Sequence, residues 1–201
     1  MTPAQIFDAL VTRGARWLPR RLFWELRAQG IHRSWGNDAD DFALVGSVID
    51  CVHPRSLIDI GCGSGRLFPV YLERGIERIV GQDISRYALS LARRRYPEAP
   101  ITLIRTELQR LPYADKEFDL CISNRVLSGV SRDAIRDVLR SVIRVSGYLY
   151  LNEYDESDFV GDSAYWLKHD YRRLLDEICS YETVTEGVAG MQTYRLFRID
   201  G

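Results

Sequence analysis

The chain of 201 residues lacks long hydrophobic runs and an excess of charge of either sign. No apolar stretch approaches the ~20 residues that a helix needs to cross a bilayer. The first residues carry arginines but no long apolar core, so they do not resemble a secretory signal. Twenty-seven basic and 28 acidic residues leave a net charge of −1, which disfavours a strongly cationic nucleic-acid-binding protein. We expect no membrane segment, and the charge balance disfavours a nucleic-acid partner.

Cysteine and histidine are too scattered to indicate a disulfide framework or a metal site. The three histidines fit no ligand spacing, and none of the cysteines has a CxxC neighbour. We therefore expect no bound metal, and reduced thiols in a cytoplasmic protein. The four cysteines are Cys51, Cys62, Cys121 and Cys179.

The composition, 46% hydrophobic and 27% charged, is typical of one compact domain. Charge is nevertheless uneven along the chain. Residues 1–36 hold six arginines and two acids, a net charge of +4, whereas residues 153–162 hold five acids and no base. These segments form either two solvated surfaces or two facing sides of a cleft. We hypothesise that residues 13–36, with Trp17, Trp24 and Trp35, form a lid over a ligand site and face the acidic segment 153–162. The alternative is that the N-terminal helices pack on the back of a sheet as stabilising cover.

From residue 56 onward, short apolar segments alternate with helical patterns, which indicates a parallel sheet with helices on both faces. Only about four residues separate the last two strands, too few for a parallel crossover, so these strands should form an antiparallel hairpin. The sequence thus predicts an α/β fold with seven mostly parallel strands, the last antiparallel, and an N-terminal helical extension. The strands are expected at 57–60, 78–83, 101–105, 118–123, 147–153, 182–188 and 192–199, and the helices that follow them at 65–75, 85–97, 131–145 and 165–179, with Ser85 and Ser131 as N-caps.

The segment LIDIGCGSGR (57–66) places Gly61, Gly63 and Gly65 between a strand and a helix. Glycines there let a ligand approach the backbone. Asp83 closes the next strand, at the distance where an acidic residue binds the ribose hydroxyls of adenosine cofactors. Dinucleotide sites use GxGxxG, but here Arg66 stands at the third glycine position. This spacing favours an adenosine cofactor without a pyrophosphate.

Three ordered segments resemble the class I S-adenosylmethionine-dependent methyltransferase family. They are LIDIGCGSGR, GQDIS (81–85) and TELQRLPYADKEFDLCISNRVLSGV (106–130). The resemblance implies a Rossmann-like sheet with strand order 3-2-1-4-5-7-6, with S-adenosylmethionine across the carboxyl ends of strands 1, 2 and 4 and S-adenosylhomocysteine as product. Residues 55–201 would then be the catalytic core of a single domain, and residues 1–54 a helical cap.

The resemblance also implies residue roles. Asp83 would hold the ribose hydroxyls, Ile84 would pack on adenine, and Glu107 would face the adenine amino group. Asp59 would orient the glycine loop and the methionine amino group. The full set of implied cofactor contacts is Asp59, Gly61, Cys62, Gly63, Asp83, Ile84, Glu107, Leu108, Ser123 and Asn124.

A methyl group on a sulfonium is already electrophilic, so the protein must mainly align the acceptor and exclude water. A general base helps only if the acceptor arrives protonated. Candidates near the methyl group are Asn124, Tyr165 and His169, while Gly129 stands where many family members carry a histidine. We expect a small-molecule acceptor, methylated on N or O. The alternatives are a macromolecular acceptor (RNA, protein or glycan) or a non-catalytic S-adenosylmethionine-binding homologue.

Overall fold

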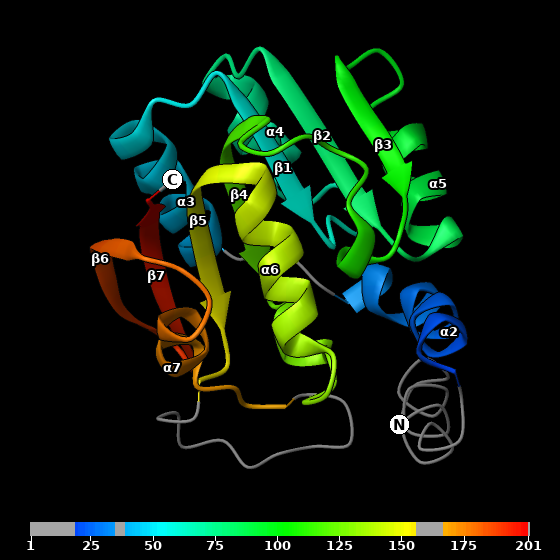
Figure 1. The fold of residues 1–201 in the computed structure, drawn as a ribbon. Coiled ribbons are helices and arrows are strands. Elements are labelled where there is room, and N and C mark those ends of the chain that lie inside the picture. The colour runs from blue at the N-terminus through cyan, green and yellow to red at the C-terminus, as the bar shows by residue number, and fades with distance from the viewer. Residues whose placement is uncertain (1–18, 35–38, 156–166, 201) are drawn as a thin grey trace.

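The structure is a computed structural model that describes residues 19–34, 39–155 and 167–200. Its strands form one sheet of order β3-β2-β1-β4-β5-β7-β6, so the predicted seven-stranded order is confirmed. Figure 1 shows the carboxyl ends of the parallel strands meeting at one edge of the sheet. The strands are β1 (Ser56–Ile60), β2 (Arg78–Asp83), β3 (Ile101–Arg105), β4 (Phe118–Asn124), β5 (Ser146–Glu153), β6 (Tyr181–Ala189) and β7 (Gln192–Ile199).

Strands β1 to β5 pair in parallel, whereas β7 runs antiparallel to both β5 and β6. The expected C-terminal hairpin is therefore confirmed. Its turn contains Gly190 at φ +62°, in the left-handed region that favours glycine. β7 lies between β5 and the edge strand β6. In a sheet of this kind, a ligand binds at the carboxyl ends of the central parallel strands, here β1, β2 and β4.

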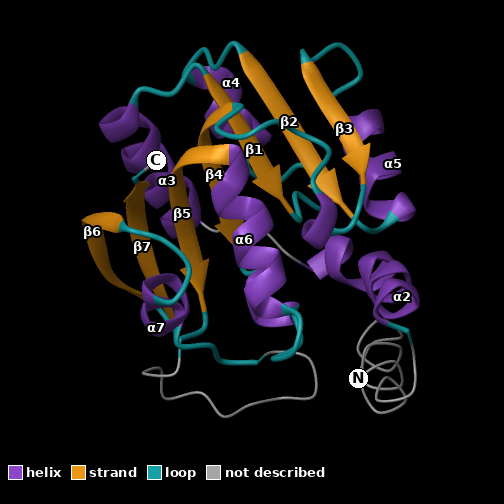
Figure 2. Ribbon diagram, viewed as in Figure 1, coloured by secondary structure: helices purple, strands orange, loops and turns teal. Residues whose placement is uncertain are grey.

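Helices cover both faces of the sheet, as Figure 2 shows. Side chains alternate along each strand, so Leu57 belongs to the cluster that includes residues of α3 (Ala39–Val52), α4 (Phe68–Glu73) and α5 (Arg86–Arg95). Its neighbour Ile58 belongs to the cluster on the other face, with α6 (Ile135–Val145) and α7 (Tyr171–Asp176). Helix α2 lies instead beyond the carboxyl ends of β2 and β3 (Figure 1). The helices are α2 (Arg20–Ser34), α3 (Ala39–Val52), α4 (Phe68–Glu73), α5 (Arg86–Arg95), α6 (Ile135–Val145) and α7 (Tyr171–Asp176).

The two predicted serine caps have different outcomes. Ser85 caps α5, because its Oγ accepts a hydrogen bond from the backbone N–H of Ala88 at 3.1 Å. The prediction for Ser131 is wrong: α6 begins only at Ile135, and its N-cap, Ala134, has no side-chain capping bond. The backbone carbonyl of Ser131 instead accepts from the N–H groups of Ala134 and Ile135. A preceding turn thus takes up the residues that the sequence assigned to the helix.

The predicted helix at 165–179 is also shorter than expected. Its described part begins at Tyr171, where Asp170 Oδ1 accepts from the backbone N–H of Arg173 at 3.0 Å. Before this cap, His169 forms an isolated parallel bridge with Asp155. In the described residues, no helix is both long and apolar enough to cross a membrane.

Candidate functional site

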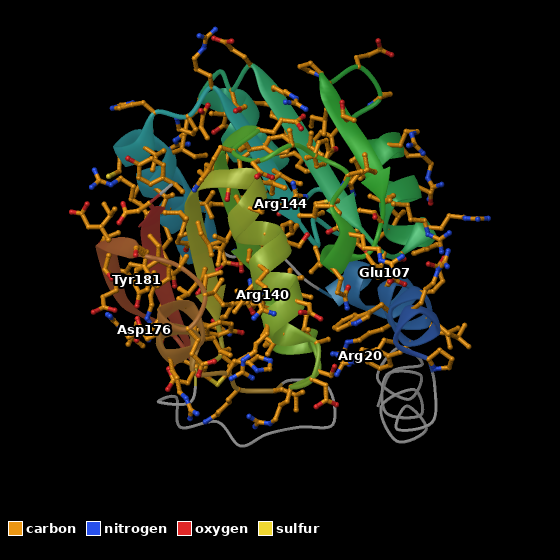
Figure 3. All side chains as sticks on the ribbon, in the orientation of Figure 1. Arg20, Glu107, Arg140, Arg144, Asp176 and Tyr181 are labelled. Carbon is orange, nitrogen blue, oxygen red and sulfur yellow. The ribbon has the colours of Figure 1, made fainter. Side chains whose placement is uncertain are left out.

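A cavity of about 440 Å³ opens at the carboxyl ends of β1, β2 and β4. Its walls come from the glycine loop, the junction of β2 with α5, the segment after β3, the loop after β4, and α2. Two lining residues, Glu107 and Arg20, are labelled beside α2 in Figure 3. Seven of the ten predicted cofactor positions line this cavity: Gly61, Gly63, Asp83, Ile84, Glu107, Leu108 and Asn124.

The glycine loop has a backbone that other residues adopt only with strain. Gly61, Gly63 and Gly65 have φ values of +63°, +58° and +78°. A Cβ atom on Gly61 would also lie 2.5 Å from a methyl carbon of Val126 in the loop after β4. The glycines therefore let two loops from neighbouring strands approach closely at the cavity.

Asp83 fixes the glycine loop and faces the cavity. Its Oδ2 accepts from the backbone N–H of Gly63 at 2.9 Å, and its Oδ1 accepts from that of Ser85 at 2.7 Å. Burial raises the pKa of Asp83, although these backbone hydrogen bonds act in the opposite direction. Because each carboxylate oxygen can accept more than one hydrogen bond, both can still bind ligand hydroxyls.

Gln82, which the sequence did not single out, fixes the same loop from the preceding position. Its Oε1 accepts from the backbone N–H of Gly61 at 3.0 Å, and its Nε2 donates to the carbonyl of Thr106 after β3. Gln82 thereby joins the ends of β1, β2 and β3. In the sequence, only its position next to Asp83 could have indicated that Gln82 supports the site.

Helix α2 forms a wall of the cavity through Arg20, Arg21, Trp24 and Ala28. Trp24 and its neighbour Glu25 also contact other elements. The indole of Trp24 covers Gly129, since a Cβ there would lie 2.6 Å from an indole carbon. The carboxylate of Glu25 accepts from the backbone N–H groups of Arg86 and Tyr87, at 2.7 and 3.1 Å, in the first turn of α5. The alternative of packing on the back of the sheet is therefore wrong for α2. Whether the lid faces the acidic segment 153–162 concerns mainly residues outside the described ranges and stays a prediction.

Comparison with known proteins identifies the family. A family model described as "Methyltransferase domain" matches residues 58–151. The chain is 27% identical over 142 residues to malonyl-[acyl-carrier protein] O-methyltransferase of Salmonella typhimurium, covering 70% of this chain and 55% of that one. It is 30% identical over 129 residues to demethylmenaquinone methyltransferase of Chlamydia trachomatis, covering 62% and 52%. Residues 58–151 therefore form a domain of the class I S-adenosylmethionine-dependent methyltransferase family.

The fold of the chain also matches solved structures. The crystal structure of an S-adenosylmethionine-dependent methyltransferase from Mesorhizobium loti has a TM-score of 0.57 and 17% identity, over 71% of this chain and 90% of that one. At this identity the likeness shows the fold alone. The chain spans about half the length of the two curated relatives that it matches.

Three of the ten predicted cofactor positions do not line the cavity. Cys62 is buried, with its side chain turned inward: a Cβ on Gly81 would lie 2.9 Å from its sulfur. Ser123 is fully buried and donates from Oγ to Glu153 Oε1 at 2.6 Å. Asp59 is buried behind the glycine loop and accepts from the Tyr71 hydroxyl at 3.0 Å. Their side chains therefore support the loops that form the cavity.

Asp59 should make the stability of the protein depend on pH. Burial raises its pKa to about 7, against the hydrogen bond from Tyr71. A folded-state pKa above the unfolded value means that its contribution is fully present below about pH 4 and is lost as pH rises through 7. At ~1.4 kcal/mol per pH unit, the loss between pH 5 and pH 8 is about 2–3 kcal/mol. Asp59→Asn keeps an oxygen that can accept from Tyr71 but cannot titrate. Unfolding free energies measured in urea should therefore fall less between pH 5 and pH 8 in this variant than in the wild type. Equal slopes of unfolding free energy against pH in the two proteins would contradict the prediction.

The three residues predicted to lie near the methyl group, Asn124, Tyr165 and His169, do not share one position. Asn124 lines the cavity. His169 is buried and does not line the cavity: its Nε2 lies 3.1 Å from the carbonyl oxygen of Val130, a lining residue, and its ring packs edge-on against Tyr171 at 5.7 Å between centroids. Tyr165 lies outside the described residues. Of the described candidates, Asn124 alone is therefore positioned to meet a ligand.

Glu153, the first acid of the segment 153–162, is a buried structural residue. Its side chain is 1% exposed, so neither a solvated surface nor a cleft wall describes it. Besides the Ser123 hydroxyl, its carboxylate accepts from three successive backbone N–H groups after β4 at 2.8, 3.0 and 3.0 Å, those of Val126, Leu127 and Ser128. It thereby shapes the loop that forms one wall of the cavity.

Asp155 also departs from the expectation of an exposed acid. It pairs with Arg195 of β7 at 2.6 Å, and both side chains are less than one tenth exposed. The pair attaches the chain after β5 to the antiparallel part of the sheet. The acidic run thus begins with two buried, partnered carboxyl groups.

A second buried acid, Asp41 of α3, was not predicted as a site residue. It is 4% exposed and accepts from Arg66 Nη2 at 2.6 Å, from Arg125 Nη2, and from Asn152 Nδ2 at 3.0 Å. Arg66 follows the glycine loop, Arg125 follows β4, and Asn152 lies on β5. Asp41 therefore connects α3 to three elements at the carboxyl edge of the sheet, beside the cavity.

Proposed function

We propose that the protein binds S-adenosylmethionine in the cavity and transfers its methyl group to a nucleophilic oxygen or nitrogen of a small molecule. The observation that carries this proposal is the Asp83 carboxylate, held at the cavity by the N–H groups of Gly63 and Ser85. The volume, about 440 Å³, falls in the range of small-molecule sites. The named activities of the relatives support a carrier-linked or small acceptor.

The residues present fit this cofactor. Asp83 would bind the ribose hydroxyls, Ile84 would contact adenine, and Glu107 at the exposed rim would meet the adenine amino group. The backbone of Gly61 and Gly63 would follow the methionine chain. When bound, the cofactor supplies an electrophilic methyl group. The protein contributes alignment of the acceptor and exclusion of water, for which the wall formed by α2 is suited.

Calorimetric titration and a methyl-transfer screen test the proposal. The wild-type protein should bind S-adenosylmethionine and S-adenosylhomocysteine and should bind NAD far more weakly. Transfer from methyl-labelled cofactor should then occur to small carboxylates, quinols or amines. Binding without transfer to any acceptor would favour the non-catalytic alternative, and transfer to RNA or protein alone would favour a macromolecular acceptor. Absence of cofactor binding would contradict the proposed function. The cytoplasmic location and the division into a cap (1–54) and a core (55–201) stay predictions.

Trp24→Ala should weaken S-adenosylhomocysteine binding roughly 5- to 30-fold, because it removes an aromatic wall worth about 1–2 kcal/mol. Calorimetry measures the affinity. Leu22→Ala is the matched control, since Leu22 lies on the same helix but is 45% exposed and does not line the cavity. Equal affinities of the two variants would show that α2 does not enclose the bound cofactor.

A further inference from the structure

We propose that Asn124, supported by Arg125, forms a carboxylate-binding site at the β4 end of the cavity. The inference rests on the proposed function, because two carboxylates can reach this end: that of the cofactor's amino acid and that of a carboxylic methyl acceptor. Both residues line the cavity. The shared chemistry is an anionic oxygen that accepts a hydrogen bond from the Asn124 amide.

The hydrogen bonds of Asn124 determine which end of its amide is available. Its Oδ1 faces two donors, Arg125 Nε at 3.3 Å and Asn152 Nδ2 at 3.4 Å. A reversed amide would place its NH₂ group against both donors, so the observed orientation is the only one that satisfies them. Asn124 Nδ2 is then left without a hydrogen-bond partner among the described residues, although the side chain is only 8% exposed.

The surroundings of this amide favour an anionic partner over a neutral one. Asp41 is shared by the guanidinium groups of Arg66 and Arg125, so two cations meet around one described carboxylate at this point. Asn152 donates to both Asp41 and Asn124 and links this ion cluster to the amide. A buried donor beside fixed positive charge binds a carboxylate oxygen more strongly than a neutral one.

The same residues determine what kind of acceptor chemistry this end of the cavity permits. An amide cannot remove a proton, and His169 does not line the cavity. A carboxylate needs no base: one oxygen forms the new C–O bond to the methyl carbon as the S–CH₃ bond breaks, and the sulfonium sulfur keeps that electron pair. The products are a methyl ester and a neutral thioether, with no proton released.

The test compares ligands with and without a carboxylate by calorimetry. S-Adenosylhomocysteine carries the amino-acid carboxylate, whereas 5′-methylthioadenosine keeps the nucleoside and thioether but lacks it. Malonate, titrated into protein saturated with S-adenosylhomocysteine, represents the acceptor. Asn124→Asp replaces the donor by a negative charge at nearly constant shape. Gln192→Glu is the matched control, since it makes the same amide-to-carboxylate change at the start of β7, in a residue that does not line the cavity.

Asn124→Asp should weaken either S-adenosylhomocysteine or malonate at least tenfold and leave 5′-methylthioadenosine within threefold, which also shows that the variant is folded. Loss of S-adenosylhomocysteine binding assigns the site to the cofactor, and loss of malonate binding assigns it to the acceptor. Asn124→Ser, which removes the amide without adding charge, serves if the aspartate variant does not fold. Unchanged binding of both carboxylates, or equal weakening of all ligands, overturns the inference. Wild-type protein that binds neither nucleoside overturns the proposed function as well.

Discussion

A Gly63→Val protein should remain folded and yet bind no detectable S-adenosylhomocysteine. Gly63 lines the cavity at φ +58°, so its backbone is available for close approach by a ligand. A branched side chain would occupy that space. The left-handed conformation costs a residue with a Cβ roughly 1–2 kcal/mol, which is less than the ~5–15 kcal/mol by which domains are stable.

The control for this prediction is Gly75→Val. Gly75 has φ +67°, and a Cβ there meets no other atom within 4 Å, so valine introduces similar backbone strain far from the cavity. Both variants should lose similar stability in urea unfolding, whereas only Gly63→Val should lose binding in calorimetry. Retained affinity in a folded Gly63→Val protein would show that the loop does not contact the cofactor.

Asp83→Ala should weaken cofactor binding about 10- to 150-fold. The alanine removes charge-assisted hydrogen bonds to the ribose, each worth ~1.5–3 kcal/mol. It also removes the acceptor for Gly63 and Ser85, so the glycine loop loses its anchor to the end of β2. The lost ribose contacts and the lost anchor of the loop both weaken binding, so the loss of affinity can exceed 150-fold.

Asp119→Ala separates ligand contact from loop support. Asp119 Oδ2 accepts from the backbone N–H groups of Arg55 and Ser56, both at 2.8 Å, at the opposite end of the sheet. It therefore has a comparable structural role without a place in the cavity. Asp119→Ala should lower the urea midpoint and leave the affinity unchanged. An affinity of Asp83→Ala within threefold of wild type, measured by calorimetry, would exclude Asp83 as the ribose ligand.

The parts of the fold that depend on local patterns could be predicted from the sequence. The ranges 78–83 and 101–105 match β2 and β3 to the residue, because each is a short apolar run with clear boundaries. Ser131 failed as a cap because a serine before a helical pattern also suits a preceding turn. The last predicted helix failed at its start because Asp170, within the range, is the residue that caps it.

The supporting residues of the site could not be predicted, because their partners are distant in the sequence. Glu153 ends a strand and begins an acidic run, which is typical of a solvated surface, but its backbone partners lie 25 to 27 residues earlier. Asp41 meets Asn152, which is 111 residues away. In contrast, Gly61, Gly63 and Asp83 lie in motifs whose spacing alone implies their position around a ligand.

The contact between Trp24 and Gly129 should make these two positions, distant in the sequence, co-vary among related sequences. With Trp24 in place, any side chain at 129 meets the indole, because even a Cβ would lie 2.6 Å from it. A lineage that introduces histidine at this position, as many class I methyltransferases have, must first replace the tryptophan with a smaller residue. Natural variants of this chain should therefore keep the tryptophan–glycine pair or change both members, and the intermediate with both bulky residues should be absent.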